Sequence, residues 1–298
     1  YWKYPLSDKP KHFIGWCVWE GTTIPKSWVD IFNIENISAI IVPSNHTLKA
    51  IQNTLKTSIN PKIHVIPHGV NNTLFKPRTI EKPKDSKFTF IANKGWAQGI
   101  NDRGGIQWLL KAFSEEFKND NDIQLICKIN IAYCPPNWNF ANEMTKIGLS
   151  PESTKNIVFV LNSMNFDELP LLYTQGDVFV SSTMGDAFNL PCLEAMACGL
   201  PVITTNFGGQ TDYVNNDNGW LVDYDLVEVK HDVMYEGNFW GLPNLNHLKD
   251  VMRNVYEQWK KGNENYIKEK AINARKTAEN YTWQNSAKQL LNLINDLE

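Results

Sequence analysis

The chain has 298 residues, of which 42% are hydrophobic, enough for two α/β domains with sizeable cores. Its formal net charge of −3 excludes the broad basic face of a nucleic-acid-binding protein. We expect no membrane span and no signal peptide, because no stretch has the required apolar length or flanks. The five cysteines lack zinc spacing and predict buried, reduced thiols in a cytoplasmic protein without a metal site.

Short apolar runs alternate with helical patterns in the first quarter of the chain. Residues 1–11 are polar and predicted to be irregular. Pro25 opens a short helix, and Ser44 is placed to cap a helix over 46–55. The prolines and charges of 76–87 predict a linker between two domains. Buried strands are predicted at 13–19, 38–43 and 63–67.

The rest of the chain repeats the same alternation over a longer span, which predicts a doubly wound parallel sheet. Residues 225–246 are acidic and aromatic, and their pattern predicts a long loop without regular structure. Helices are predicted at 106–117, 166–173, 248–259 and 264–297, the last one broken near 281–283. Strands are predicted at 88–92, 123–127, 157–160, 177–180, 201–204 and 219–222.

Residues 185–205 join a strand, a polar loop, a short helix and a further strand. Polar loops at the carboxyl ends of strands are where open α/β sheets bind ligands. Asp186 and Glu194 bracket the loop, and Gly199 is placed to end the helix over 193–198. We expect Glu194 on the first turn, where a carboxylate accepts both hydroxyls of a ribose while loop amides and the helix start attract a phosphate. The stretch therefore predicts a nucleotide site.

This stretch resembles the retaining glycosyltransferases of family 4, which have the GT-B fold. Their hallmark is an E-x7-E motif within E-G-F-G-L-P-x-L-E-A-M-A-x-G-x-P-V-I. Three positions depart from it, since Asp186 replaces the first Glu and Ala187 and Asn189 replace two loop glycines. The matching residues are Phe188, Leu190, Pro191, Leu193, Glu194, Ala195, Met196, Ala197, Gly199, Pro201, Val202 and Ile203.

The resemblance implies an α/β, GT-B-like fold with two Rossmann-type parallel-sheet domains facing a cleft. Residues 1–76 would form the amino-terminal, acceptor-side domain, which is incomplete because further βα units of the family are missing. Residues 77–281 would bind the nucleotide sugar. Residues 282–298 would form a terminal helix that returns to the first domain.

The implied activity is transfer of a sugar from a UDP-, GDP- or ADP-sugar to a glycan, lipid or protein acceptor. It would proceed with retention of anomeric configuration and need neither cofactor nor metal. By resemblance, Asp186 faces the donor sugar and Glu194 the ribose, while Phe188, Asn189 and Leu190 line the same pocket. A peripheral membrane contact and a partner subunit that completes the first domain stay open.

Two cations are expected to neutralise the leaving diphosphate. The family uses an Arg at the end of the first strand of this domain and a Lys in K-G-x-x-x-L-x-x-A-F. Here Lys94 occupies the end of that strand, whereas Gly104 falls on the Lys position and Arg103 is its neighbour. We predict that Lys94 and Arg103 form the clamp, with Lys128 in reserve. The alternative, that both are ordinary surface cations, stays open.

Five other residues are weaker candidates, each equally compatible with a structural role. Asn162 lies near the position where relatives hold the base, and Gly208 and Gly209 approach the sugar. Glu20 and His68 lie on the acceptor side.

Two other functions remain compatible with these residues. One is a non-catalytic or truncated GT-B-like subunit that binds a sugar nucleotide or a partner protein without turnover. The other is a different GT-B enzyme such as a sugar-nucleotide epimerase, although its His and Glu pattern is absent.

Overall fold

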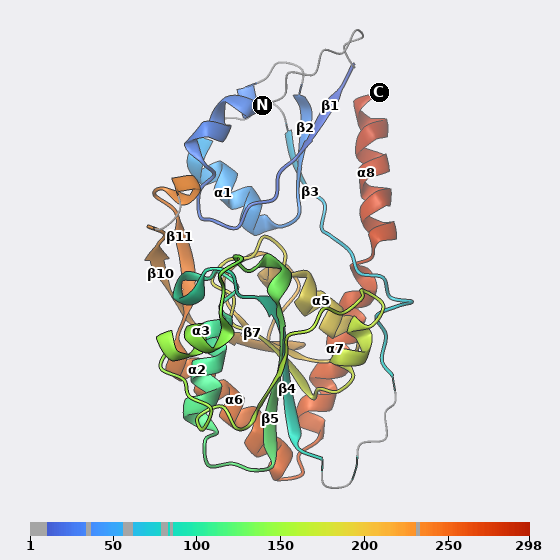
Figure 1. Cartoon of the computed structure of the whole chain (residues 1–298). Coiled ribbons are helices and arrows are strands. Elements are labelled where there is room, and N and C mark those ends of the chain that lie inside the picture. The colour runs from blue at the N-terminus through green and yellow to red at the C-terminus, as the bar shows by residue number, and fades with distance from the viewer. Residues whose placement is uncertain (1–10, 34–36, 56–61, 79–82, 84–85, 231–232) are drawn as a thin grey trace.

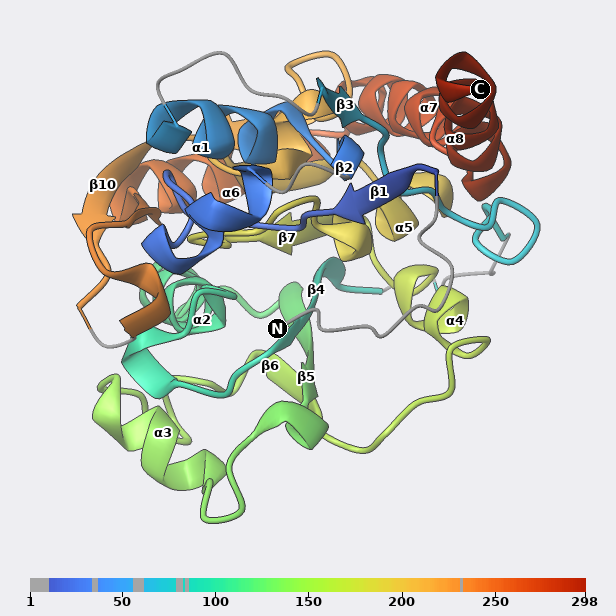
Figure 2. The same ribbon diagram turned by 90° about the horizontal axis from the view of Figure 1, so that it is seen from above.

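The computed structural model describes residues 11–33, 37–55, 62–78, 83, 86–230 and 233–298. These residues form a three-stranded parallel sheet, a six-stranded parallel sheet and a two-stranded antiparallel hairpin. The smaller sheet lies above the larger one in Figure 1, and over β7 and α5 in Figure 2. Residues 1–10 and part of the predicted linker lie outside the described residues.

The smaller sheet contains β1 (Phe13–Trp16), β2 (Ile37–Val42) and β3 (Lys62–Val65), in that order. The predicted cap is confirmed: the Thr47 amide donates to Ser44 Oγ over 3.3 Å at the start of α1 (Asn45–Leu55). The prediction of a buried strand through residue 19 is wrong, since β1 ends at Trp16 and that side chain is 49% exposed. The short helix predicted from Pro25 is the 3-10 helix η1 (Lys26–Asn33).

The larger sheet has its strands in the spatial order β6-β5-β4-β7-β8-β9, all parallel. The first strand of the domain, β4, lies beside the fourth, β7, so the order reverses between them. In open α/β sheets, ligands bind outside the carboxyl ends of strands at such a point. The strands are β4 (Phe88–Gly95), β5 (Ile123–Asn130), β6 (Ile157–Val160), β7 (Val178–Ser181), β8 (Val202–Thr205) and β9 (Gly219–Val222).

Helices cover both faces of this sheet because successive residues of a buried strand point to opposite sides. Phe90 packs in the cluster with α2 (Ile106–Glu116) and α6 (Leu245–Lys260). Its neighbour Ile91 packs in the cluster with α5 (Leu190–Ala197) and α7 (Asn265–Asn280). The α3 helix spans Phe140–Lys146, and short 3-10 turns lie at Gly99–Asn101, Ile131–Tyr133, Gly209–Asp212 and Val233–Tyr235.

Two helix predictions need correction. The helix predicted over 166–173 is the shorter α4 (Leu169–Tyr173), because Asn165 and Glu168 form a turn in which the Asn165 amide donates to the Glu168 carboxylate over 2.6 Å. The α5 helix begins at Leu190 rather than 193, with its end at Gly199 confirmed by a φ of 84°.

The prediction of a structureless stretch over 225–246 is also wrong. β10 (Tyr224–Glu228) pairs antiparallel with β11 (Phe239–Pro243). Trp240 anchors the hairpin, because it is buried in a cluster with Met184 and Val229. The acidic side chains of β10 are exposed, which explains the polar pattern of this hairpin in the sequence.

The terminal helix α8 (Trp283–Leu297) lies beside the smaller sheet (Figure 1). Leu293 packs against Ala39 and Ile41 of β2. Ser286 Oγ donates to the Pro67 carbonyl over 2.5 Å. The end of the chain therefore contacts the first sheet although α7 covers the second.

Candidate active site

The loop between β7 and α5 is organised by Asp186. Its Oδ1 accepts hydrogen bonds from the Phe188 amide over 3.1 Å and the Asn189 amide over 2.5 Å. Asn189 has a φ of 66°, a left-handed conformation that asparagine tolerates better than most non-glycine residues. This explains how Asn189 stands in a position where the related motif has a glycine.

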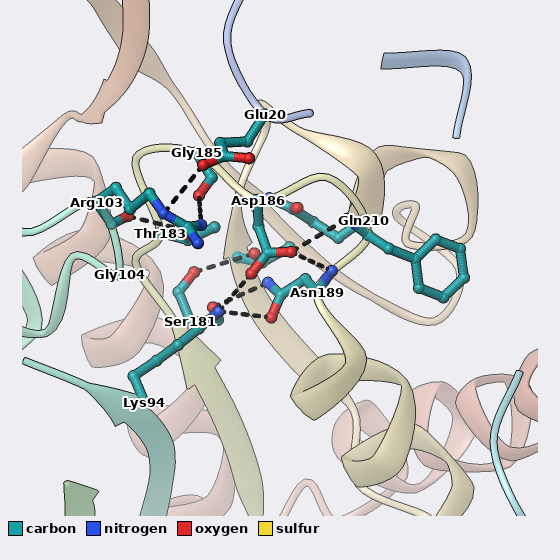
Figure 3. Close-up of polar contacts among 12 residues, drawn as sticks. Glu20, Lys94, Arg103, Gly104, Ser181, Thr183, Gly185, Asp186, Asn189 and Gln210 are labelled. Atoms are coloured by element: carbon teal, nitrogen blue, oxygen red, sulfur yellow. Dashed lines mark hydrogen bonds and ion pairs between the residues drawn. The ribbon is translucent and has the colours of Figure 1, made fainter. Parts of the chain in front are cut away.

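Lys94 points from the end of β4 into this loop (Figure 3). Its Nζ lies 2.9 Å from Asp186 Oδ2 and 2.9 Å from Asn189 Oδ1. Asn189 Nδ2 in turn donates to Ser181 Oγ over 3.0 Å. The Lys94 side chain is only 10% exposed, so the alternative of an ordinary surface cation does not describe it.

The charge of Asp186 is stabilised where it lies. Burial alone would raise the pKa of its carboxyl, but Lys94, Arg103 and the Phe188 amide outweigh burial and lower that pKa. Asp186 is therefore ionised at neutral pH, and its charge compensates that of Lys94.

The loop before α2 presents Arg103. Asp102 holds this loop, because its carboxylate accepts from the amides of Ala97 over 2.6 Å, Gln98 over 3.0 Å and Gly104 over 2.8 Å. Gly105 abuts the end of β7: an added Cβ would lie 1.8 Å from the Ser182 carbonyl oxygen. The loop is thus fixed against the same loop that carries Asp186.

The guanidinium of Arg103 joins the two domains. Nη1 donates to the Gly185 carbonyl over 3.0 Å, and Nε lies 3.1 Å from Glu20 Oε1, in the first domain (Figure 3). Glu20 also accepts from the Tyr235 hydroxyl. Burial alone would lower the pKa of Arg103, but Glu20 and Asp186 raise it, so both predicted cations are charged and each faces a carboxylate.

Gly208 and Gly209 support the loop from the side of β8. The Gly209 amide donates to the Asp186 carbonyl over 2.8 Å. An added Cβ on Gly209 would lie 1.9 Å from the Ala187 carbonyl oxygen, and Gly208 has a φ of 106°. Both glycines are needed for the two loops to approach this closely.

Glu194 lies in the second turn of α5, so its predicted place in the first turn is wrong. The cause is the earlier start of the helix. The side chain is buried, and Oε2 accepts from the Tyr173 hydroxyl over 2.7 Å. Burial raises the pKa of Glu194, although Tyr173 and Lys94 partly offset this effect.

The remaining candidates divide into two groups. His68, from the first domain, lies with its ring centroid 5.1 Å from that of the buried Phe188, and burial lowers its pKa. Leu190 is partly buried at the start of α5. Lys128 is buried and donates to the Ile129 carbonyl over 3.2 Å, while Asn162 is exposed. Neither of these last two hydrogen bonds to the Asp186 cluster.

Similar structures share this architecture. Sucrose-phosphate synthase from Thermosynechococcus elongatus superposes with a TM-score of 0.64 at 20% identity, over 89% of this chain and 59% of that one. A glycosyltransferase from Rickettsia africae superposes with a TM-score of 0.67 at 18% identity, over 96% and 70%. The chain has the GT-B fold. The predicted fold class is thereby confirmed.

Sequence similarity lies mainly in the second GT-B domain. Residues 96–233 match the family model for glycosyl transferases group 1. A probable sucrose-phosphate synthase of Thermosipho melanesiensis is 26% identical over 240 residues, covering 79% of this chain and 48% of the relative. An MMP alpha-(1->4)-mannosyltransferase of Mycolicibacterium hassiacum is 26% identical over 162 residues, covering 54% and 35%. The chain thus spans about half or less of these relatives.

Several residues of this GT-B site escaped sequence reasoning. Ser181 and Tyr173 hydrogen bond to predicted site residues but lie within a predicted strand-to-loop junction and a predicted helix. Ser44 was expected only to cap a helix, yet its hydroxyl also donates to the Ala187 carbonyl over 2.7 Å. Only the polarity of these residues within apolar runs could have drawn attention to them.

Two broader observations concern the described ranges alone. Within them, no helix is both long and apolar enough to cross a membrane, and no three metal-ligating side chains converge. A surface hollow of about 680 Å³ is lined by residues of α2 and of 147–155, away from Asp186.

Proposed function

We propose that this chain carries the donor site of a glycosyltransferase that uses a nucleotide sugar. The observation that carries the proposal is the convergence of Lys94, Asp186 and Arg103 at the point where strand order reverses between β4 and β7. The match of 96–233 to glycosyl transferases group 1 supports it.

The two cations suit a diphosphate leaving group. In the structure Lys94 is held by Asp186 and Arg103 by Glu20, so both are fixed in place and charged. Preorganised charges of this kind stabilise the negative charge that develops on the diphosphate as the sugar departs. Arg103, with its side chain 46% exposed, can exchange Glu20 for a phosphate.

The remaining roles follow from the resemblance. Glu194 would accept the ribose hydroxyls, and Asp186 with the loop at 187–190 would face the donor sugar. The acceptor hydroxyl would attack the anomeric carbon on the face that the diphosphate leaves, and its proton would pass to a departing phosphate oxygen. The configuration is then retained without a protein nucleophile or a metal. Glu20 and His68 would lie on the acceptor side.

Thermal-shift measurements with UDP-, GDP- and ADP-sugars test donor binding directly. We expect one base to raise the melting temperature, and Lys94→Ala to abolish most of this increase. The matched control is Lys146→Ala, which removes an exposed lysine paired with Glu143 on α3. If none of the three classes shifts the melting temperature, the proposal fails.

Release or transfer of the sugar separates an enzyme from a non-catalytic binder. We expect slow hydrolysis of the recognised donor, and faster sugar release when glycan, lipid or peptide acceptors are added. Binding without any sugar release would instead favour the non-catalytic alternative. One relative from Arabidopsis thaliana, 24% identical, is named as part of a phosphatidylinositol N-acetylglucosaminyltransferase with more than one kind of chain, and a partner protein is accordingly part of the proposal.

A further inference from the structure

The geometry points to Tyr173 as a positioning residue that holds the Glu194 carboxylate in its ligand-binding orientation. This inference rests on the proposed function, because it assigns Glu194 to the nucleotide. Tyr173 ends α4 and is fully buried. Its hydroxyl is the polar exception in a cluster formed with rings such as Phe75 and Phe179.

Three side chains form a directed chain of hydrogen bonds. Asn93 Nδ2 donates to the Tyr173 hydroxyl over 3.1 Å, and that hydroxyl donates to Glu194 Oε2 over 2.7 Å. Because the oxygen of Tyr173 is occupied by the Asn93 amide, its proton is directed to Glu194. Within the part of the chain that the structure describes, Glu194 Oε1 accepts no hydrogen bond. One carboxylate oxygen is thus fixed, and the other is left for a ligand.

The end of β4 serves both carboxylates of the site. Lys94 contacts Asp186, whereas the preceding residue, Asn93, reaches Glu194 through Tyr173. Neighbouring residues of a strand point to opposite faces of the sheet, so a single strand end reaches both. The spacing of Asp186 and Glu194 is in this way tied to one rigid element.

Electrostatics requires a donor at this position. Burial raises the pKa of Glu194, and the hydrogen bond from Tyr173 opposes that effect. Burial and the Glu194 charge raise the pKa of Tyr173 well above its usual value, so the hydroxyl remains a proton donor at neutral pH. Without this donor, the buried carboxylate would take up a proton more readily and lose acceptor capacity.

Calorimetric titration of Tyr173→Phe tests this role, because the change keeps the ring and removes the hydroxyl. The probes are UDP, GDP and ADP, each compared with its 2′-deoxy form between pH 5 and 8. For the diphosphate that binds wild type, we expect the Kd to rise about tenfold at pH 7, as for loss of a hydrogen bond to a charged group. The preference for the ribo form should shrink, and binding should be lost at a higher pH than in wild type.

Tyr256→Phe is the matched control, since Tyr256 is equally buried but donates to Asp122 outside the site. It should leave the Kd and its pH profile unchanged. If Tyr173→Phe does not fold, Asn93→Ala takes its place and should give a smaller change in the same direction. Failure of wild type to bind any probe overturns both proposals. Binding by wild type with unchanged affinity, ribose preference and pH profile in the variant overturns the role of Tyr173 alone.

Discussion

Asp186 combines two tasks in one side chain. Oδ1 accepts the backbone amides that precede α5, and Oδ2 accepts the ammonium of Lys94. A carboxamide retains some hydrogen bonding but has no charge to compensate Lys94. The sequence motif identifies this position, and the shorter Asp in place of Glu agrees with a carboxylate that folds back on its own loop.

For Asp186→Asn, we predict a loss of about 2 kcal/mol of unfolding free energy at pH 7, because a largely buried ammonium loses its partner. The pKa of Asp186 is lowered, so its contribution is full above the usual value of 3.8 and is lost as the pH falls through the folded-state pKa. Urea unfolding from pH 6 to 3 should therefore show wild type and variant converging at the acid end. Asp167→Asn, at an exposed position, should show no such convergence.

For Glu194→Gln, we predict the opposite pH dependence of stability. The pKa of Glu194 is raised above its usual 4.5, so wild type loses stability as the pH rises from that value through the folded-state pKa. The variant has no such penalty, and its unfolding free energy relative to wild type should increase from pH 4 to 7. Calorimetry should at the same time show nucleotide binding weakened at least tenfold. A variant that loses relative stability over this pH range would contradict the assignment.

At the scale of elements, the site depends on loops that approach each other closely. Gly105 and Gly148 have similar φ values, 74° and 78°. An alanine at 105 would place its Cβ 1.8 Å from the Ser182 carbonyl, whereas at 148 nothing lies within 4 Å. These two glycines therefore separate the cost of the backbone conformation from the cost of the contact.

We predict that Gly105→Ala lowers the unfolding free energy by more than about 3 kcal/mol and also weakens donor binding. Gly148→Ala should lower it by only about 1 kcal/mol, the cost of a left-handed residue with a Cβ, and leave binding intact. Chemical unfolding with calorimetry measures both effects. Equal losses in the two variants would show that the loop before α2 does not need its close contact with β7.

Elements with strong periodicity were predicted well, and those formed by tertiary pairing were not. All six strands of the larger sheet appear where apolar runs predict them. The hairpin of β10 and β11 was missed because it has an exposed acidic face and its single strong anchor, Trp240, packs on Met184, a residue remote in sequence. Helix α5 begins earlier than predicted because Asp186 and Asn189 supply its start.

At the scale of the whole molecule, the first domain contacts the site loop directly. Ser44 donates to the Ala187 carbonyl, Asp212 accepts from the Asn45 amide over 2.7 Å, and Glu20 pairs with Arg103. The site is thus completed by residues of both domains. Movement of one domain relative to the other would change the partners of Arg103.

We predict that Glu20→Gln makes nucleoside diphosphate binding two- to fivefold tighter. A half-exposed ion pair is worth about 0.5–1 kcal/mol, and in the variant that energy is no longer needed to free Arg103 for a phosphate. Calorimetry at 50 and 300 mM salt should show the advantage narrowing at the higher salt concentration. Weaker binding by the variant would instead show that Glu20 supports the ligand itself.

The sequence by itself determined the alternation of strands and helices, the loop and helix at 185–205, and the candidates Lys94, Arg103, Asp186 and Glu194. These follow from local patterns, because hydrophobic periodicity and turn residues act over a few positions. Only the tertiary structure decided the partners: Lys94 with Asp186, Arg103 with Glu20, and Tyr173 with Glu194. Such pairs depend on which strands become neighbours in the sheet and how the two domains meet, and both are settled by packing of residues far apart in the chain.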